Sequence, residues 1–289
     1  MPSFDPSNIS IRKLSRDQFE SVIAWAAREG WNPGLHDAEI FWQTDPDGHY
    51  GLFLQDRLIG SGSVISYKSS YGFMGLFIMD PEFRGQGLGH RLWFARRDIL
   101  LSRLRPGSAI GMDGVFAMQP FYARGGFVCT HRNLRMEGVG KTGKPGRGLV
   151  ELSQIPFEKV LAFDCVHFGL PRPEFLKPWI VPDGGRGLGL LTGGELTGMG
   201  VVRPCRTGFK IGPLFAQNAA GAETIFNALS NHAVGQPLFL DLPENNPDAL
   251  ALAQRQGMKE VFGCARMYYG PRPRTPWERI YGVTTFELG

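Results

Sequence analysis

Cysteine is scarce in this 289-residue sequence, and the four cysteines present, at positions 129, 165, 205 and 264, lie far apart. They form neither a Cys-x-x-Cys pair nor a metal-binding pattern, so we expect no metal site and a reduced compartment. Long hydrophobic runs are also lacking, because no stretch approaches the roughly 20 apolar residues that cross a bilayer. Residues 1–10 show no basic segment followed by an apolar one, so no signal peptide is indicated and the cytoplasm is the expected location.

A strong charge of either sign is likewise absent. Lysine and arginine number 31 and aspartate and glutamate number 27, which gives a net charge of +4. That charge is too small and too dispersed to indicate a nucleic-acid partner, and we expect no membrane partner either. A chain of 289 residues can bury a substantial core and is long for one domain, which favours two domains of similar size.

Glycine, in contrast, is plentiful, and three glycines alternate at positions 85, 87 and 89 within the stretch Tyr71–Leu104. An apolar run ends just before them at Asp80-Pro81, and from Leu88 onward apolar residues recur at helical spacing. The stretch therefore predicts a strand, a glycine loop and a helix. Three residues without a Cβ would let a phosphate approach backbone N–H groups that the following helix leaves unpaired.

The residues that flank the three glycines argue against two well-known kinds of nucleotide-binding loop. A nucleoside-triphosphate loop needs Gly-Lys-Ser/Thr after its last glycine, whereas His90-Arg91 follows here. A dinucleotide fold needs Gly-x-Gly-x-x-Gly, and here the third glycine comes one residue early. Two interpretations are left: a loop for another kind of pyrophosphate, with Arg84 and His90 beside it, and a glycine-rich turn that only caps a helix.

The predicted elements of the first half follow the order strand, two helices, three-stranded meander, helix, strand, helix and strand. The apolar patterns place them at residues 9–14, 15–28, 38–44, 50–55, 58–67, 71–79, 88–104, 109–112, 119–124 and 127–137. Together with the Arg-x-x-Gly-x-Gly motif at 84–89, this order resembles the GNAT acetyltransferases over residues 1–137. The resemblance implies an α/β (α+β) fold with a mixed central sheet flanked by helices.

The resemblance also implies that acetyl-CoA is the cosubstrate. The glycine loop would bind its pyrophosphate, and the end of the fourth strand would pair with its pantetheine arm. The expected cofactor-binding residues are Phe77, Ile78, Met79, Arg84, Gly85, Gln86, Gly87, Leu88, Gly89 and His90.

A second motif supports the resemblance. The segment 121–127 is similar to the family's Tyr-x-x-x-Gly-Phe, in which the tyrosine returns a proton to the departing thiolate, and this makes Tyr122 a candidate catalytic residue. A phenol with a pKa of about 10 is protonated at neutral pH and can donate to a thiolate whose parent thiol has a pKa of about 8.5. A tyrosine of the core or of a lid is the alternative. The family often has asparagine seven residues earlier, where Val115 stands.

The proton acceptor is harder to predict. Many family members carry a glutamate on the fourth strand, but Tyr71–Met79 contains no acidic residue. Asp113, at the end of the fifth strand, is the first candidate for the catalytic base, although it could equally cap the following turn. His36, Asp37 and Glu39 are the second candidates.

Those three residues belong to the segment 31–39, which combines turn formers with an aromatic ring, an imidazole and two carboxylates. Such a mixture suits the rim of a pocket for a basic amine, which makes Trp31, Asn32, His36 and Asp37 the candidate substrate-binding residues. It suits equally well a capped turn before the helix at 38–44, with Trp31 in the core.

Residues 138–148 are rich in glycine and predict a linker between domains at 1–137 and 149–289. The second half repeats the first in degenerate form, since residues 216–221 lack Arg-x-x-Gly-x-Gly and Ala253 stands where Tyr122 would. Its Arg-Met-x-x-Gly strand at 266–270 and its Glu-Leu-Gly tail at 287–289 resemble those of bacterial two-domain GNAT proteins. The resemblance implies that Asp164, Phe168-Gly169 and Arg172 line the cleft of the second domain.

These patterns predict an N-acetyltransferase that moves an acetyl group from acetyl-CoA to a primary amine by direct attack in a ternary complex. A non-catalytic acyl-CoA-binding or ligand-sensing protein is the leading alternative, and a structural scaffold is the third. Acidic residues at 37, 39, 45 and 47 suggest a cationic acceptor. Small-molecule and peptide amines both remain open as acceptors, and so does a homodimer.

Overall fold

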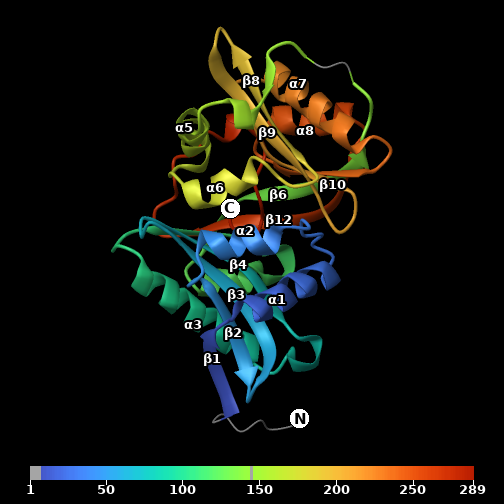
Figure 1. The fold of residues 1–289 in the computed structure, drawn as a ribbon. Coiled ribbons are helices and arrows are strands. Elements are labelled where there is room, and N and C mark those ends of the chain that lie inside the picture. The colour runs from blue at the N-terminus through green and yellow to red at the C-terminus, as the bar shows by residue number, and fades with distance from the viewer. Residues whose placement is uncertain (1–7, 144–145) are drawn as a thin grey trace.

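The computed structural model describes residues 8–143 and 146–289. Figure 1 shows two lobes, one above the other, with strands β6 and β12 crossing between them. The elements of the lower lobe's half are β1 (Ile9–Lys13), α1 (Arg16–Arg28), α2 (Asp37–Thr44), β2 (His49–Leu54), β3 (Arg57–Tyr67), β4 (Tyr71–Met79), α3 (Leu88–Arg103), β5 (Ala109–Val115), α4 (Gln119–Arg124) and β6 (Val128–Val139). Every element predicted for this half is present, with its ends shifted by a few residues.

The second half repeats this order. Its elements are β7 (Leu149–Glu151), α5 (Phe157–Phe168), α6 (Pro173–Trp179), β8 (Arg186–Thr192), β9 (Glu195–Pro204), β10 (Phe209–Ala216), α7 (Ala219–Ser230), β11 (Pro237–Pro243), α8 (Pro247–Arg255), β12 (Lys259–Tyr269) and β13 (Ile280–Gly282). Each half thus contains an antiparallel meander followed by one parallel strand pair, β4 with β5 and β10 with β11.

The last long strand of each half completes the sheet of the other half. β12 pairs with β5, β6 pairs with β11, and β6 and β12 pair with each other, all antiparallel. The described residues therefore form one 13-stranded mixed sheet in which the central order is β4-β5-β12-β6-β11-β10. The predicted linker at 138–148 includes residues 144–145, which lie outside the described residues, and its first two residues belong to β6. The sheet is continuous between the two predicted domains.

Local sequence signals explain how the helices cover this sheet. A capping box forms at the start of α1, where the Ser15 hydroxyl accepts from the Gln18 backbone amide and the Gln18 side chain accepts from the Ser15 backbone amide. The apolar face of α1 then packs Phe19 and Ile23 into a core that also contains Trp179 of α6 and Leu288 of the tail. One face of the sheet therefore shares a single core between the two halves.

Candidate active site

The fourth strand is distorted where the predicted site lies. Pairing of β3 with β4 shifts between Ser63–Gly75 and Ser61–Ile78, so Leu76 and Phe77 of β4 lie opposite one residue of β3. This is a β-bulge, and Leu76 has a positive φ of 50°. Arg96 of α3 stabilises it by donating to the carbonyl oxygens of Ser63 and Gly75 at 2.7 and 2.8 Å.

Beyond the bulge, β4 separates from its neighbour. The parallel pairing of β4 with β5 covers only Tyr71–Met74 and Ala109–Met112. The rest of β4, with Phe77, Ile78 and Met79, therefore presents an unpaired edge toward this gap, as strand-type recognition of an extended ligand requires.

The glycine loop begins at the end of this edge. Gly85 and Gly87 have φ of +74° and +78°, and no heavy atom lies within 4 Å of a Cβ placed on either. Gly87 precedes α3 without any side-chain cap, and no described side chain accepts a hydrogen bond from the amides of residues 85–90. The N-terminus of this 16-residue helix therefore has free donors and its positive dipole end facing open space.

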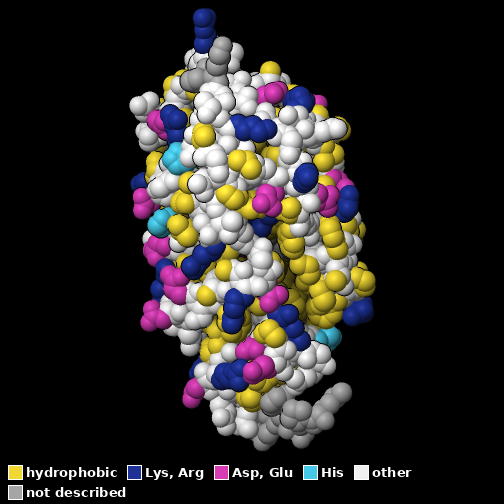
Figure 2. Space-filling view, turned by 90° about the vertical axis from the view of Figure 1, so that its right-hand side faces the viewer, with side chains coloured by type: hydrophobic (Ala, Val, Ile, Leu, Met, Phe, Trp, Pro, Cys, Tyr) yellow, Lys and Arg dark blue, Asp and Glu magenta, His cyan; other side chains and the backbone are white. Residues whose placement is uncertain are grey.

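A groove joins the loop to the strand edge. It is lined by Phe77–Met79, by the loop residues Arg84, Gly85, Gly87, Gly89 and His90, and by Met118, Phe121 and Tyr122 from the region of α4. Arg84 does not point freely into solvent, because its side chain donates to the Met79 carbonyl oxygen at 3.0 Å and pairs with Glu29. Figure 2 shows a crevice with hydrophobic side chains along one side.

The groove continues into a second, inner chamber. Both hollows are lined by Trp31, Phe77, Val115 and Tyr122. The inner chamber adds mostly apolar residues and three charged ones, and its further lining is Met74, Gly75, Leu76, Met112, Asp113, Arg135, Phe262, Cys264, Phe286 and Glu287. It therefore lies where β4, β5, β6, β12 and the tail of the chain meet.

Tyr122 stands at the junction of the groove and the chamber. Its ring stacks on Trp93 with the centroids 5.8 Å apart, and the residue is 4% exposed. Burial raises the pKa of the phenol to about 12, so it stays protonated at neutral pH. A protonated hydroxyl at this junction can donate a hydrogen bond to a ligand atom that lies at the inner end of the groove.

Asp113 is held by an ion pair. Arg266 of β12 donates to its two oxygens at 2.9 and 2.6 Å, and the Asn133 amide donates to it at 2.8 Å. Burial raises the pKa of this carboxyl, and Arg266 and Asn133 oppose that change. Asp113 lines the chamber, but both of its oxygens already have donors.

The predicted rim residues separate into two groups. Trp31 lines both hollows. Asn32 instead bonds the loop before β10, because its side chain contacts the backbone of Thr207 at 2.9 and 3.0 Å. Asp37 is buried against Arg203 of β9 at 2.9 and 3.1 Å, and half-exposed His36 lies 3.7 Å from Asp183. Asn32, His36 and Asp37 therefore lie at the contact between the two halves rather than in the chamber.

The carboxylates that suggested a cationic acceptor all have partners in the chain. Asp37 pairs with Arg203, Glu39 with Arg16, Asp45 with Arg103 and Asp47 with Lys13. They leave no excess negative charge for an amine.

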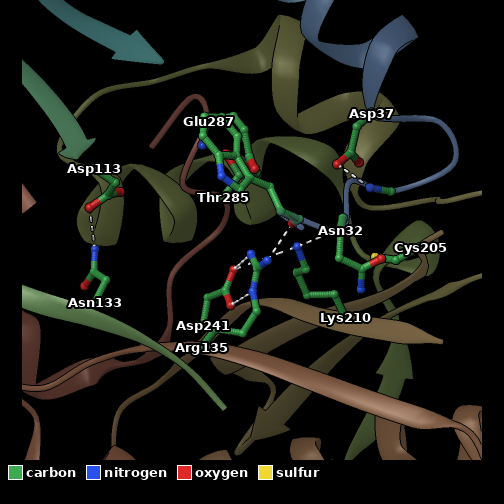
Figure 3. Close-up of polar contacts among 12 residues, drawn as sticks. Asn32, Asp37, Asp113, Asn133, Arg135, Cys205, Lys210, Asp241, Thr285 and Glu287 are labelled. Atoms are coloured by element: carbon green, nitrogen blue, oxygen red, sulfur yellow. Dashed lines mark hydrogen bonds and ion pairs between the residues drawn. The ribbon is translucent and has the colours of Figure 1, made fainter. Parts of the chain in front are cut away.

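Several chamber residues were not identified by the sequence patterns, and Phe262, Cys264, Phe286 and Glu287 among them come from the second half. Glu287 is 5% exposed. Arg135 of β6 also lines the chamber, and it forms a buried bidentate ion pair with Asp241 of β11, both bonds at 2.7 Å (Figure 3). The only sequence signal for Glu287 was the Glu-Leu-Gly tail, which indicated a family but no role. Of the residues expected in the second domain's cleft, Arg172 donates to Gly289 and Thr284, and Phe168 and Gly289 line the same hollow. Asp164 pairs with Arg172.

Comparison with known proteins agrees with this geometry. Two models, each described as an acetyltransferase (GNAT) domain, match residues 36–142 and 160–282. The chain belongs to the GNAT acetyltransferases, as a tandem protein with two domains of this family, and it is an acyltransferase. The predicted family and fold class are thus confirmed.

Three relatives extend over nearly the whole chain. Holothin acyltransferase from a Pseudoalteromonas species is 28% identical over 96% of this chain and 94% of its own. A provisionally assigned acetyltransferase from Pyrococcus horikoshii superimposes with a TM-score of 0.84 at 24% identity, covering 100% of this chain and 99% of that one. A tandem GNAT protein from the clavulanic acid biosynthesis pathway gives a TM-score of 0.62 at 12% identity, covering 92% and 99%.

No helix in the described part of the chain is long and apolar enough to span a membrane. No group of three or more histidine, cysteine, aspartate or glutamate residues in that part of the chain is arranged to hold a metal ion.

Proposed function

We propose that the protein is an N-acetyltransferase that transfers the acetyl group of acetyl-CoA to a primary amine in a ternary complex. The observation that carries this proposal is the groove that opens, at Tyr122, into the inner chamber. The groove offers free loop amides at one end and an unpaired strand edge along its length, which suit a pyrophosphate and a pantetheine arm.

The chamber would hold the acceptor. In the reaction, the amine nitrogen forms a bond to the carbonyl carbon of the thioester, and the carbon–sulfur bond breaks. Tyr122 gives its proton to the departing thiolate, and the proton of the amine passes to a carboxylate of the chamber. Holding the two reactants in line contributes much of the rate.

The lining of the chamber favours a small acceptor with an apolar body. Met74, Met112, Phe262 and Phe286 surround the space, and the second half closes it from one side. A recessed chamber with a mostly apolar lining fits such an amine better than a polyamine or a protein lysine. The name of one relative, Holothin acyltransferase, makes holothin the first compound to include as an acceptor.

Two measurements test the function. Acetyl-CoA binding is followed by calorimetry, and release of free CoA is followed with holothin, phenethylamine, spermidine, glucosamine and a lysine peptide. We expect acetyl-CoA to bind and at least one apolar amine to be acetylated. If acetyl-CoA binds but none of these amines is acetylated, the result would favour an acyl-CoA-binding or ligand-sensing protein. If acetyl-CoA does not bind, the result would favour a structural scaffold.

A pair of glycine variants tests the cofactor loop. Gly87 and Gly193 both have positive φ, and an added Cβ would meet open space at either position. Gly87 lies in the proposed cofactor loop, whereas Gly193 lies in the β8–β9 hairpin and serves as the control. We expect Gly87→Ala to weaken acetyl-CoA binding about tenfold, because the Cβ enters the phosphate's approach, and Gly193→Ala to leave it unchanged. Equal affinities would contradict the assignment of the loop.

A further inference from the structure

The segment 280–289 fills, in the second half, the position that the groove has in the first. Like β4 and β5, β10 and β11 pair over only a short length, Phe209–Ile211 with Leu238–Leu240. β13 then pairs with the free end of β10 at Leu214 and Phe215, and the Val283 amide donates to the Asp241 carbonyl oxygen of β11 at 2.7 Å. The chain itself thus occupies the opening between the two strands.

From there the segment continues into the first half. Tyr67 of β3 donates its hydroxyl proton to the Leu288 carbonyl oxygen at 2.8 Å, and Arg172 donates to an oxygen of Gly289 at 2.9 Å. The Glu287 carbonyl oxygen lies so close to Gly75 that a Cβ on that glycine would be 1.9 Å from it. The tail is therefore anchored directly against the bulge of β4.

The anchored tail places Glu287 at the chamber. The Thr285 hydroxyl oxygen accepts from the amides of Glu287 and Leu288 at 3.1 and 2.9 Å, which fixes the turn. Glu287 is one of the residues that line the chamber, together with Tyr122 and Leu76. Its carboxylate lies near enough to Arg135 and Cys264, which line the chamber as well, to interact with both electrostatically. Its oxygens have no hydrogen-bond donor among the described residues, whereas both oxygens of Asp113 do.

Charged groups face Glu287 from both halves (Figure 3). Burial raises the pKa of the carboxyl and Asp37 adds to the effect, while Lys210, Arg135 and Arg203 oppose it. These cations are themselves engaged, Arg135 with Asp241, Arg203 with Asp37, and Lys210 with the Asn32 carbonyl oxygen at 3.0 Å. A carboxylate with a raised pKa is a better proton acceptor near neutral pH than an ordinary one.

We propose that Glu287 is the catalytic residue that accepts the proton of the acceptor amine. This inference rests on the proposed function and assigns a base that the fourth strand of this chain lacks. As the nitrogen–carbon bond forms and the carbon–sulfur bond breaks, one proton passes from nitrogen to Glu287 and another from Tyr122 to sulfur. The second half thereby contributes to a reaction whose cosubstrate binds the first half only.

The test compares Glu287→Gln with Glu278→Gln, a matched change at an exposed carboxylate just before the segment 280–289. CoA release with phenethylamine is measured from pH 6 to pH 9, together with acetyl-CoA affinity and the midpoint of thermal unfolding. We expect Glu287→Gln to lower kcat by about 10²- to 10⁴-fold and to remove the acidic limb of the kcat profile, which reports the groups of the enzyme–substrate complex. Its acetyl-CoA affinity should stay within about threefold, and Glu278→Gln should behave as wild type.

Glu287→Asp keeps the carboxylate, so it tests the inference even if Glu287→Gln does not fold. It should retain the acidic limb with a reduced kcat. If Glu287→Gln folds, binds acetyl-CoA and keeps both its kcat and the acidic limb, the inference is overturned while the acetyltransferase function stands. If the wild type acetylates none of the five compounds, the function itself fails and the inference falls with it.

Discussion

Tyr122 and Asp37 were both predicted to be site residues, but the structure places them in different surroundings. Tyr122 lies where the groove meets the chamber, and its hydroxyl group has no hydrogen bond to a described residue. Asp37 is instead buried in an ion pair that joins α2 to β9. The motif at 121–127 predicts a specific position for Tyr122 beside the cosubstrate. A carboxylate in a turn, in contrast, is equally compatible with a pocket rim and with a structural ion pair.

Removing the phenol separates the two interpretations of Tyr122. We expect Tyr122→Phe to lower kcat about 10²-fold with unchanged acetyl-CoA affinity, because the ring still stacks on Trp93 while the proton donor is lost. CoA release and calorimetry provide the measurements, and Tyr50→Phe on β2 serves as the control. A Tyr122→Phe variant with full kcat would make this residue a core tyrosine.

Asp37→Asn tests whether the rim carboxylate is structural. The change leaves the Arg203 guanidinium buried without its counter-charge, which we expect to cost about 3–5 kcal/mol in the free energy of unfolding by denaturant. Glu39→Gln, in the same helix but in an exposed pair with Arg16, should cost less than about 1 kcal/mol. An unchanged stability with a raised KM for the amine would instead return Asp37 to the acceptor site.

At the scale of elements, the bulge in β4 and the tail depend on each other. Gly75 leaves room for the Glu287 carbonyl oxygen, and Arg96 donates to the Gly75 carbonyl oxygen. A glycine at this position is required by close approach of another part of the backbone, not by its own φ. The bulge therefore fixes both the strand edge and the position of the tail.

Gly75→Ala should displace the tail. A Cβ there would meet backbone, which cannot rotate away, so we expect a loss of about 1–3 kcal/mol in unfolding free energy and a large loss of kcat. Gly221→Ala in α7 is the control, because its nearest contact is a flexible leucine methyl group at 3.2 Å. A fully active Gly75→Ala enzyme would show that the tail has no part in the reaction.

Sequence patterns predicted the elements well because their signals are local. The helix at 15–28, the alternating strands and the glycine loop each depend on neighbours within a few residues. The placement of Glu287 depends instead on a segment that returns from the second half to β4, and no local pattern encodes that path. The same reason explains why Arg135, Phe262 and Cys264 were not predicted to line the chamber.

For the whole molecule, the exchange of β6 and β12 is the dominant feature. β5 has β12 as its neighbour and β11 has β6, so the sheet of each half is completed by the other (Figure 1). The buried pairs Asp113–Arg266 and Asp37–Arg203 also connect the two halves. We therefore expect the two halves to unfold together.

Residues 1–140 expressed alone test this expectation. Without β12, the β5 edge is unpaired, and without β11 and β12, β6 has no partner at all. We expect the fragment to lack a cooperative unfolding transition by circular dichroism, while the full chain shows a single one. A fragment that unfolds cooperatively and binds acetyl-CoA would demonstrate an independent first domain.

The strand exchange also bears on how such a protein can change over time. If the two halves arose by duplication, loss of the cofactor loop from one copy would ordinarily free that copy for deletion. Here deletion would take away a strand that the surviving copy's sheet needs, together with the carboxylate in its chamber. The second half lacks the glycine motif, but the first half still needs its strand β12. We therefore expect the sequence of the second half to vary most at positions that do not contact the first half.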